Sequence, residues 1–443
     1  MVKIMLISII ATLRSSPSTA RTFSCLVSSR HRLAFFSPGL KRVKGTCTSQ
    51  KLQRQLFAQR RERSSQEQKE TDTSVPAILP FASEYHTPVM VKEVVETLVH
   101  DPTGVYIDGT LGGGGHSEAI LGRLASLGGA GQLLAVDRDP EALASARTRL
   151  AAHLEAGRFA TAQSDFRHLK TVLGPGGALS SRMPADGLGV HGLLLDLGVS
   201  SHQLDESSRG FSHQSDGPLD MRMESDEKVV GESSPAATCD GEGAIVSSEI
   251  ADLGHRRRRG PGLTAAVVVN EWPVEELRRV LQDYGEEPRA HKMALRLSEA
   301  RPLNTTAQVA DVVRSCLPPG PPKDKRKALS RVFQGLRIAV NDEMGALEAV
   351  LMDATRFVRP GGRIVVLSYH SLEDRRVKRV LRSGGLDGKV EQDMFGNVLS
   401  PWRPLRKVPK APSSKEVAMN SRARSAKLRA SERTDYPPPS LPR

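Results

Sequence analysis

The chain has 443 residues, of which 38% are hydrophobic, so it is long enough for two or three domains with sizeable cores. Lys and Arg outnumber Asp and Glu by 63 to 50, and the net charge of +13 favours a polyanionic partner such as nucleic acid, although a basic targeting leader can produce part of it. No apolar run approaches the roughly 20 residues that span a bilayer, which argues against a membrane-spanning protein. The spacing of Cys25, Cys47, Cys239 and Cys316 fits neither a metal site nor a disulfide framework, which favours a reducing compartment.

The first 80 residues differ in composition from the rest of the chain. Residues 1–61 contain no Asp or Glu and are rich in Arg, Lys and Ser, which is typical of an organelle transit peptide. The apolar run "IMLISIIATL" fits a bipartite plastid leader, and a mitochondrial presequence tolerates it; a disordered basic tail is the alternative. We expect residues 1–80 to be a transit peptide and disordered leader, and the protein to be organellar, in a mitochondrion or plastid.

From about Tyr85 the pattern becomes that of a globular α/β protein. The apolar residues of "PVMVKEVVETLV" recur with helical spacing and predict a helix. Short buried strands then alternate with helices, which predicts a parallel sheet with helices on both faces. We expect strands within 104–110, 131–137, 158–166 and 190–201, and helices at 117–127 and 141–154.

The alternation stops near Leu204, and a different texture follows. Residues 224–264 are rich in Gly, Ser and Glu and are expected to be a disordered insertion, whereas 272–317 have helical periodicity. "GPPKDKRKA" is interpreted as a linker, and a long helical stretch then leads into a strand within "PGGRIVVLSYHS". The predicted parts are a leader at 1–80, a core at 81–204 and 326–390, a helical insert at 205–325 with disorder at about 224–266, and a basic tail along the surface at 391–443.

The loop after the first expected strand, "DGTLGGGGHS", is the first candidate site. Glycines at the end of a parallel strand let a ligand lie against the backbone. Asp137 ends the second strand, where its carboxylate can accept hydrogen bonds from ribose hydroxyls. Together they predict a cofactor that carries a nucleoside, without choosing between a nicotinamide dinucleotide and S-adenosylmethionine.

Three further features favour S-adenosylmethionine. Asp108 ends the first strand and is placed to face the cationic amino acid end of that cofactor, whereas a dinucleotide needs the helix N-terminus free for pyrophosphate. "SDF", which ends in Phe166, suits an adenine pocket, and Asp196 ends the fourth strand, where a transferred group would sit. No hydride-transfer pair such as Tyr-x-x-x-Lys stands out. A glycine-rich turn without a ligand is the alternative.

Eight stretches between Glu84 and Thr434 carry a family resemblance. In order they are "HTPVMVKEVVETL", "YIDGTLGGGGHS", "LLAVDRDP", "LLLDLGVSSHQLDESSRGFSHQSDGPLDMRM", "YGEE", "RVFQGLRIAVNDEM", "PGGRIVVLSYHSLEDRRVK" and "NSRARSAKLRASER". Together they resemble the small-subunit (16S-type) ribosomal RNA cytosine-N4 methyltransferases, the RsmH/MraW family, which has organellar members. The fourth stretch is the longest and most distinctive.

The resemblance implies an α/β fold: a class I S-adenosylmethionine-dependent methyltransferase (Rossmann-like) core with an inserted all-helical substrate domain. It implies N4-methylation of a cytidine in the decoding region of small-subunit ribosomal RNA. The residues expected to contact S-adenosylmethionine are Gly114, Gly115, His116, Asp137, Phe166, Asp196 and Gln203. Gly113 departs from the family, where Arg or Lys is common, and His202 replaces a frequent Pro; neither removes an expected cofactor residue.

The exocyclic amine of cytosine is a poor nucleophile, so most of the rate should come from placement and desolvation. We expect Asp196, or a backbone carbonyl in 197–201, to accept a hydrogen bond from the amine. His370 is a second catalytic candidate as a general base, although a lone His more often has a structural role. No metal is expected.

The expected partner is small-subunit ribosomal RNA or the assembling small ribosomal subunit, and a homodimer is allowed for. Four basic stretches are candidates to hold RNA phosphates: "KDKRK", "RRVKRVLR", "RPLRKVPK" and "SRARSAKLR". Two alternatives stay open at this point: a noncatalytic RNA-binding ribosome-assembly factor, and a different enzyme on the same scaffold, such as an amino-methyltransferase acting on another nucleic acid.

Overall fold

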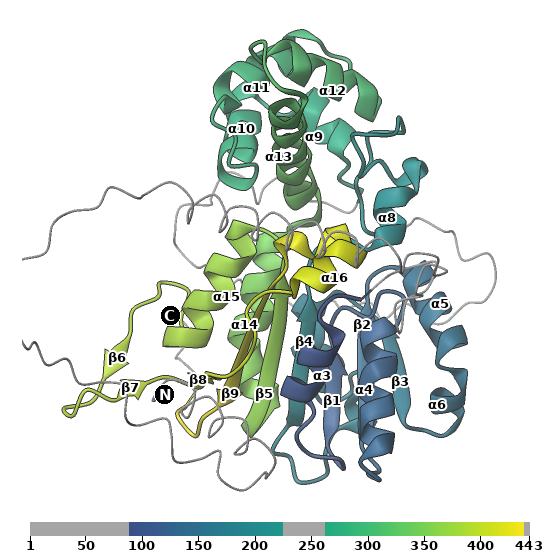
Figure 1. Cartoon of the computed structure of the whole chain (residues 1–443), viewed down its shortest axis with the longest axis vertical. Coiled ribbons are helices and arrows are strands. Elements are labelled where there is room, and N and C mark those ends of the chain that lie inside the picture. The colour runs from purple at the N-terminus through teal and green to yellow at the C-terminus, as the bar shows by residue number, and fades with distance from the viewer. Residues whose placement is uncertain (1–87, 225–261, 438–443) are drawn as a thin grey trace, which may run out of the picture. The chain divides into compact units, whose positions relative to one another are not determined.

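The computed structural model describes residues 88–224 and 262–437, which include one large sheet (Figure 1). Its seven strands lie in the order β3-β2-β1-β4-β5-β9-β8. They are β1 (Val105–Asp108), β2 (Gln132–Asp137), β3 (Phe159–Gln163), β4 (Val190–Asp196), β5 (Val358–Ser368), β8 (Trp402–Pro404) and β9 (Lys427–Arg433). A small second sheet pairs β6 (Glu391–Gln392) with β7 (Val398–Leu399).

The first five strands are parallel, as the alternation of strands and helices predicts. Ile107 of β1 lies between Leu134 of β2 and Leu193 of β4, so β1 and β4 are the central neighbours. The chain first winds outward from β1 to β3 and then continues on the other side through β4 and β5. Such a reversal leaves a crevice beyond the carboxyl ends of the two central strands, where ligands of α/β proteins bind.

Helices cover both faces of this sheet, because successive strand residues point to opposite faces. On β1, for example, Tyr106 packs toward α3 and α4, while Ile107 packs toward α14 and α15. The first face is covered by α3 (Val91–Leu98), α4 (Gly115–Ser126) and α5 (Pro140–Arg149), and the second by α7 (Leu169–Leu173), α14 (Glu343–Phe357) and α15 (Ser371–Ser383). The mixed α/β class with a parallel sheet is therefore confirmed.

A second group of helices has a core of its own, centred on Trp272, Leu281, Met293 and Leu336. It contains α9 (Ala265–Glu271), α10 (Val274–Arg279), the π-helical turn η5 (Val280–Tyr284), α11 (Ala290–Glu299), α12 (Thr306–Ser315) and α13 (Pro322–Asn341). These helices gather beyond one end of the sheet (Figure 1). The shorter elements are α6 (Ala151–Glu155), η1 (Phe166–His168), η2 (Ser180–Arg182), α8 (Ser201–Asp205), η3 (Ser207–Arg209), α16 (Ser414–Met419) and η6 (Ser421–Ser425).

The helical insert runs further than the sequence predicts. Most of the expected linker, from Pro322 onward, is helical and forms the start of α13, where proline's missing N–H costs nothing. Leu329, Phe333 and Leu336 of the same helix pack in the core of the insert. The boundary with the α/β core therefore lies at Asp342, whose positive φ of 49° separates α13 from α14, and not at residue 326.

The C-terminal stretch also needs correction, because it does not all lie along the surface. β9 pairs antiparallel with β5 and places Leu428 and Ala430 in the core. Its basic residues are accommodated by acids: Arg429 Nε donates to Asp374 Oδ1 at 2.6 Å. The alternation of apolar and charged residues in 427–433 is a strand pattern that the high charge concealed.

Two predictions lie outside the described residues: the leader at 1–80 and most of the insertion, at 225–261. Ala265 and Ala266, which fall within the expected disorder, begin α9. Among the residues that the structure describes, none of the helices is both long enough and apolar enough to cross a membrane.

Candidate active site

A cavity of about 470 Å³ opens at the carboxyl ends of β1, β2 and β4. One side is made by strand-end loops of the α/β core, which we call the sheet half; it includes Gly112, Asp137 and Phe166. The other side is made by the insert and includes Ser330, Phe333, Gln334 and Arg337 of α13; we call it the helix half. Asp196, Tyr369 and His370 line the same cavity.

The glycine loop shapes the sheet half, but its members have different roles. Gly115 and His116 line the cavity. Gly114 does not line it; it precedes α4 with φ 77°, and an added Cβ would lie 3.2 Å from Ala146 Cβ of α5. Gly114 is therefore needed for the turn and for helix packing, which is a different role from the cofactor contact expected of it.

Asp137 faces the cavity from the end of β2. Its carboxylate accepts the backbone N–H of Gly112 at 2.7 Å and that of Asp139 at 2.9 Å, which fixes its orientation. Burial raises the pKa of Asp137 to about 6, against the lowering effect of these two hydrogen bonds. The group is thus a well-oriented acceptor that is mostly ionised at neutral pH.

Asp108 is not where the sequence interpretation placed it. Its side chain is fully buried and accepts from the Ser117 hydroxyl at 2.7 Å and from the Thr110 backbone at 3.1 Å. It does not line the cavity, and burial raises its pKa. Asp108 therefore holds the glycine loop against the start of α4, and the expectation that it faces the cationic end of a cofactor is wrong.

Asp196, at the end of β4, is held on two sides. The Tyr369 hydroxyl donates to Asp196 Oδ1 at 2.8 Å, and Nδ1 of His116 lies 3.5 Å from Oδ2. The other ring nitrogen of His116 donates to the Val89 carbonyl at 2.9 Å, so the imidazole cannot turn away. Burial, together with the Asp196 charge, raises the pKa of Tyr369 well above its ordinary value, which keeps it a hydrogen-bond donor.

His370 is the N-cap of α15, and its ring interacts with the first turn of that helix. Nδ1 accepts the backbone N–H of Glu373 at 3.4 Å, and Nε2 lies 3.2 Å from Glu373 Oε1, at ion-pair distance but outside hydrogen-bond geometry. Because Nδ1 uses its lone pair on the backbone, the neutral ring carries its proton on Nε2. This arrangement favours the structural role of His370 over that of a general base.

Gln203 and Phe166 both reach the cavity. Gln203 is buried, caps α8 by accepting the Ser200 backbone N–H at 3.1 Å, and donates to Asp139 Oδ2 at 3.1 Å. Phe166 begins η1, one residue after Asp165. The structure thus brings together Gly115, His116, Asp137, Phe166, Asp196 and Gln203 around one cavity, with Gly114 beside it.

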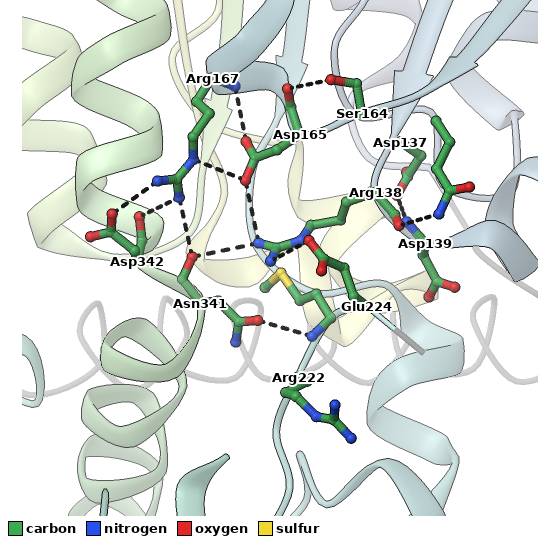
Figure 2. Close-up of polar contacts among 12 residues, drawn as sticks. Asp137, Arg138, Asp139, Ser164, Asp165, Arg167, Arg222, Glu224, Asn341 and Asp342 are labelled. Carbon is green, nitrogen blue, oxygen red and sulfur yellow. Dashed lines mark hydrogen bonds and ion pairs between the residues drawn. The ribbon is translucent and has the colours of Figure 1, made fainter. Parts of the chain in front are cut away.

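Polar contacts join the sheet half to the start of α14, where the insert ends (Figure 2). Arg138 lies 3.5 Å from Asp165 and donates to the Asn341 carbonyl at 3.5 Å. Arg167 forms ion pairs with Asp165 at 3.1 Å and with Asp342 at 3.0 Å. The loop that carries Phe166 is therefore tied to the boundary between the insert and the core.

The sequence analysis did not predict the residues of the helix half, although their spacing follows a recognisable pattern. Ser330, Phe333, Gln334 and Arg337 follow the i, i+3, i+4, i+7 spacing of one helix face and all line the cavity. Tyr369 was also missed as the partner of Asp196, as were Arg422 and Ser425 of η6, which line the cavity from the C-terminal stretch. Arg422 Nη2 donates to Asp205 Oδ1 at 2.6 Å.

Similarity to known proteins shows the family of this chain. The model of the MraW methylase family matches residues 83–233 and 249–434. The chain belongs to the MraW methylase family. It is 38% identical over 356 residues to "Ribosomal RNA small subunit methyltransferase H" of Amoebophilus asiaticus, covering 80% of this chain and 97% of that protein.

A second relative of this family, the protein of the same name from Parabacteroides distasonis, is 41% identical over 350 residues, or 79% of this chain and 97% of its own. Among solved structures, an rRNA methylase from Streptococcus thermophilus aligns with 78% of this chain and 94% of its own, at 11% identity and a TM-score of 0.29. The family assignment rests on the sequence matches.

The sheet half fits the methyl donor of an MraW methylase, S-adenosylmethionine. The whole cavity, at about 470 Å³, is within the range of sites for small molecules and cofactors. Gly112 has φ 47°, and a Cβ added there would meet nothing within 4 Å, so the loop leaves open space beside its backbone. Asp137 would offer a carboxylate to ribose hydroxyls and Phe166 an apolar ring to adenine, since both line the cavity.

One group of side chains in this MraW methylase resembles a metal site. Candidate ligand atoms of Glu343, His370 and Glu373 lie within 4.8 Å of one another. The Arg337 guanidinium, however, holds both oxygens of Glu343, at 2.8 and 2.9 Å. The Glu343 carboxylate is therefore already paired with a positive charge on both of its oxygens.

Proposed function

We propose that this chain methylates the N4 amine of a cytidine in small-subunit ribosomal RNA, using S-adenosylmethionine. The observation that carries the proposal is the two-sided cavity of an MraW methylase, with Asp196 lining it beside both the glycine loop and Tyr369. The names of the relatives support the RNA substrate. Modification of the decoding region would support maturation of the ribosome.

The chemistry requires an acceptor for the amine's N–H bonds. When bound, S-adenosylmethionine supplies an electrophilic methyl group on its sulfonium. Asp196 accepts a hydrogen bond from N4 and stabilises the positive charge that develops on this nitrogen as the N–C bond forms and the S–C bond breaks; its carboxylate then takes the proton that N4 loses. Tyr369 and His116 hold the carboxylate in one orientation, so little reorganisation is needed when the amine arrives.

Positive charge outside the cavity supports an RNA partner. Lys378, Arg379 and Arg382 of α15 are exposed, on a helix whose cap, His370, lines the cavity. Phosphate contacts supply most of the nonspecific affinity for nucleic acid, and this cluster of exposed cations can make them, although most of the chain's net charge of +13 lies in residues 1–80. We infer that α15 guides the RNA backbone toward the opening of the cavity.

Transfer of tritium from labelled S-adenosylmethionine tests the substrate. Purified chain would be incubated with small-subunit RNA, assembled small subunits, large-subunit RNA and DNA. We expect label in small-subunit RNA or subunits only, and loss of that label with Asp196→Asn. Label in DNA would instead support an amino-methyltransferase of another nucleic acid, and RNA binding without label would support a noncatalytic assembly factor.

We further propose an organellar location, because residues 1–61 lack acids and are rich in Arg, Lys and Ser. A fusion of residues 1–80 to a fluorescent protein should accumulate in mitochondria or plastids, and a cytosolic signal would contradict the proposal. That two copies of the chain associate stays a prediction, which analytical ultracentrifugation of the purified chain would check.

A further inference from the structure

Arg337 carries a half-buried charge that methyl-donor binding does not explain. Its side chain is 16% exposed, and that of its partner, Glu343, is 10% exposed. Nε donates to Glu343 Oε1 at 2.8 Å and Nη2 to Oε2 at 2.9 Å, so the carboxylate holds one edge of the guanidinium. Burial alone would lower the pKa of Arg337, but the Glu343 charge beside it raises that pKa.

Glu343 binds only the Nε–Nη2 edge of the guanidinium, and the Nη1–Nη2 edge is left for another acceptor. Nη1 and the second hydrogen of Nη2 form a pair of parallel N–H donors, and Arg337 lines the cavity. The fork belongs to the helix half, one turn after Phe333, which supplies an apolar ring to the same wall. A planar acceptor with two adjacent lone pairs matches this edge.

The fork also lies near the residues proposed to carry the reaction. Glu343, its partner, has an oxygen within 4.8 Å of ligand atoms of both His370 and Glu373. His370 follows Tyr369 directly, and the Tyr369 hydroxyl holds Asp196. The Arg337–Glu343 pair thus lies close to the segment that carries Tyr369, the partner of Asp196.

We propose that Arg337 selects cytosine by donating two hydrogen bonds to N3 and O2 of the flipped-out base. In cytosine these atoms are adjacent acceptors, and N4 is the next group along the same edge, so a base held by Arg337 presents its amine beside the fork. Uracil carries a hydrogen on N3 and would set a donor against a donor. The proposal rests on the proposed cytidine substrate and names the residue that recognises it.

Substrate and enzyme changes can be combined to test the contact. Small-subunit RNA would be prepared with the target cytidine, or with 3-deazacytidine, in which C–H replaces N3. For the unmodified enzyme we expect the change to lower kcat/KM roughly 10- to 100-fold, the discrimination of a good bidentate contact. Arg337→Lys keeps the charge but loses the fork, so its kcat/KM on cytidine should fall by a similar factor. For this variant, replacing cytidine with 3-deazacytidine should lower kcat/KM by less than about 3-fold.

Arg331 provides the matched control. It lies on the same helix and pairs with the buried Glu287 at 2.6 Å, but it does not line the cavity. Arg331→Lys should keep the full sensitivity to N3. If Arg337→Lys unfolds, the double variant R337Q/E343Q removes both charges at once and should show the same insensitivity to N3 with unchanged affinity for S-adenosylmethionine.

The outcomes separate the two proposals. Suppose that the unmodified enzyme methylates cytidine, and that replacing N3 lowers kcat/KM as much for the Arg337 variant as for the unmodified enzyme. This result would overturn the role of Arg337 and leave the proposed function standing. No transfer to any cytidine amine by the unmodified enzyme would overturn the proposed function, and the role of Arg337 with it.

Discussion

The two halves of the cavity are built from different kinds of structure. In the sheet half, glycines with positive φ and short acidic side chains at strand ends leave room beside the backbone, and Gly112 is an example. In the helix half, long side chains of a single helix, α13, form the wall. A wall made by backbone tolerates few substitutions, so it can be detected in the sequence as a motif. A wall made by one helix can be detected only from the regular spacing of the side chains on one helix face.

The largest effect that separates the halves is expected at Asp196. Asp196→Asn keeps the shape but weakens the acceptor, so single-turnover methyl transfer should fall about 10²- to 10⁴-fold, the usual contribution of a positioned proton acceptor. Affinity for S-adenosylmethionine, measured by calorimetry, should change only a few-fold. Full turnover with weakened cofactor binding alone would place Asp196 with the sheet half.

Asn341 is expected to stabilise the junction between the insert and the α/β core. Its side chain accepts from the Met223 backbone at 2.9 Å and donates to the Met221 carbonyl at 2.7 Å, both buried. Asn341→Ala leaves these groups unpaired and should lower the free energy of unfolding by about 2–4 kcal/mol, as judged by denaturant titration.

Asn270 is the control for that boundary. It makes a similar pair of hydrogen bonds to Leu303, at 2.7 and 2.8 Å, but inside the insert. Asn270→Ala should also destabilise the fold while methyl transfer at low temperature stays near normal. Asn341→Ala should reduce transfer as well, because Asn341 follows Arg337 by one helical turn. If both variants reduced methyl transfer equally, a specific effect of Asn341 on the active site would be contradicted.

The sheet half should respond to pH through Asp137. Its raised pKa of about 6 means that the carboxylate is protonated at pH 5 and ionised above about pH 7. The ionised form accepts better from ribose hydroxyls, so affinity for S-adenosylmethionine should rise several-fold between pH 5 and 7 and then level off. Asp137→Asn should bind more weakly and lose this dependence; an unchanged profile would assign the titration to another group.

The smallest effect is expected outside both halves, on α15. Replacing Lys378, Arg379 and Arg382 with Gln should reduce the slope of log K for RNA against log salt by up to about 0.7–0.9 for each phosphate that the variant no longer neutralises. Replacing the exposed Lys92 and Arg123 on α3 and α4 is the control and should leave the slope unchanged. An unaltered slope in the α15 variant would move the RNA path to another surface.

The sequence predicted the sheet half well, because strand ends and glycines are local features. Strands β1 to β4, Asp137 and Asp196 follow from alternation and spacing alone. The role of Asp108 was misjudged because a strand-end carboxylate can point to either side of the sheet, and only the Ser117 contact shows which.

The helix half could not be predicted in the same way. Asp342 breaks one long helical pattern into α13 and α14, which belong to the insert and the core respectively, and nothing local marks that assignment. The pairing of Arg337 with Glu343 lies across this break. β9 was taken for a surface tail because its apolar residues are few and its partner, β5, is distant in sequence.

The identity of the methylated nucleoside tests the proposed function most directly. Small-subunit RNA treated with the enzyme and S-adenosylmethionine would be digested to nucleosides and analysed by mass spectrometry against N4-methyl, N4-dimethyl and C5-methyl standards. We predict N4-methylcytidine, because Asp196 is proposed to face an exocyclic amine where the two halves meet. Methyl on C5, or two methyls on N4, would contradict it.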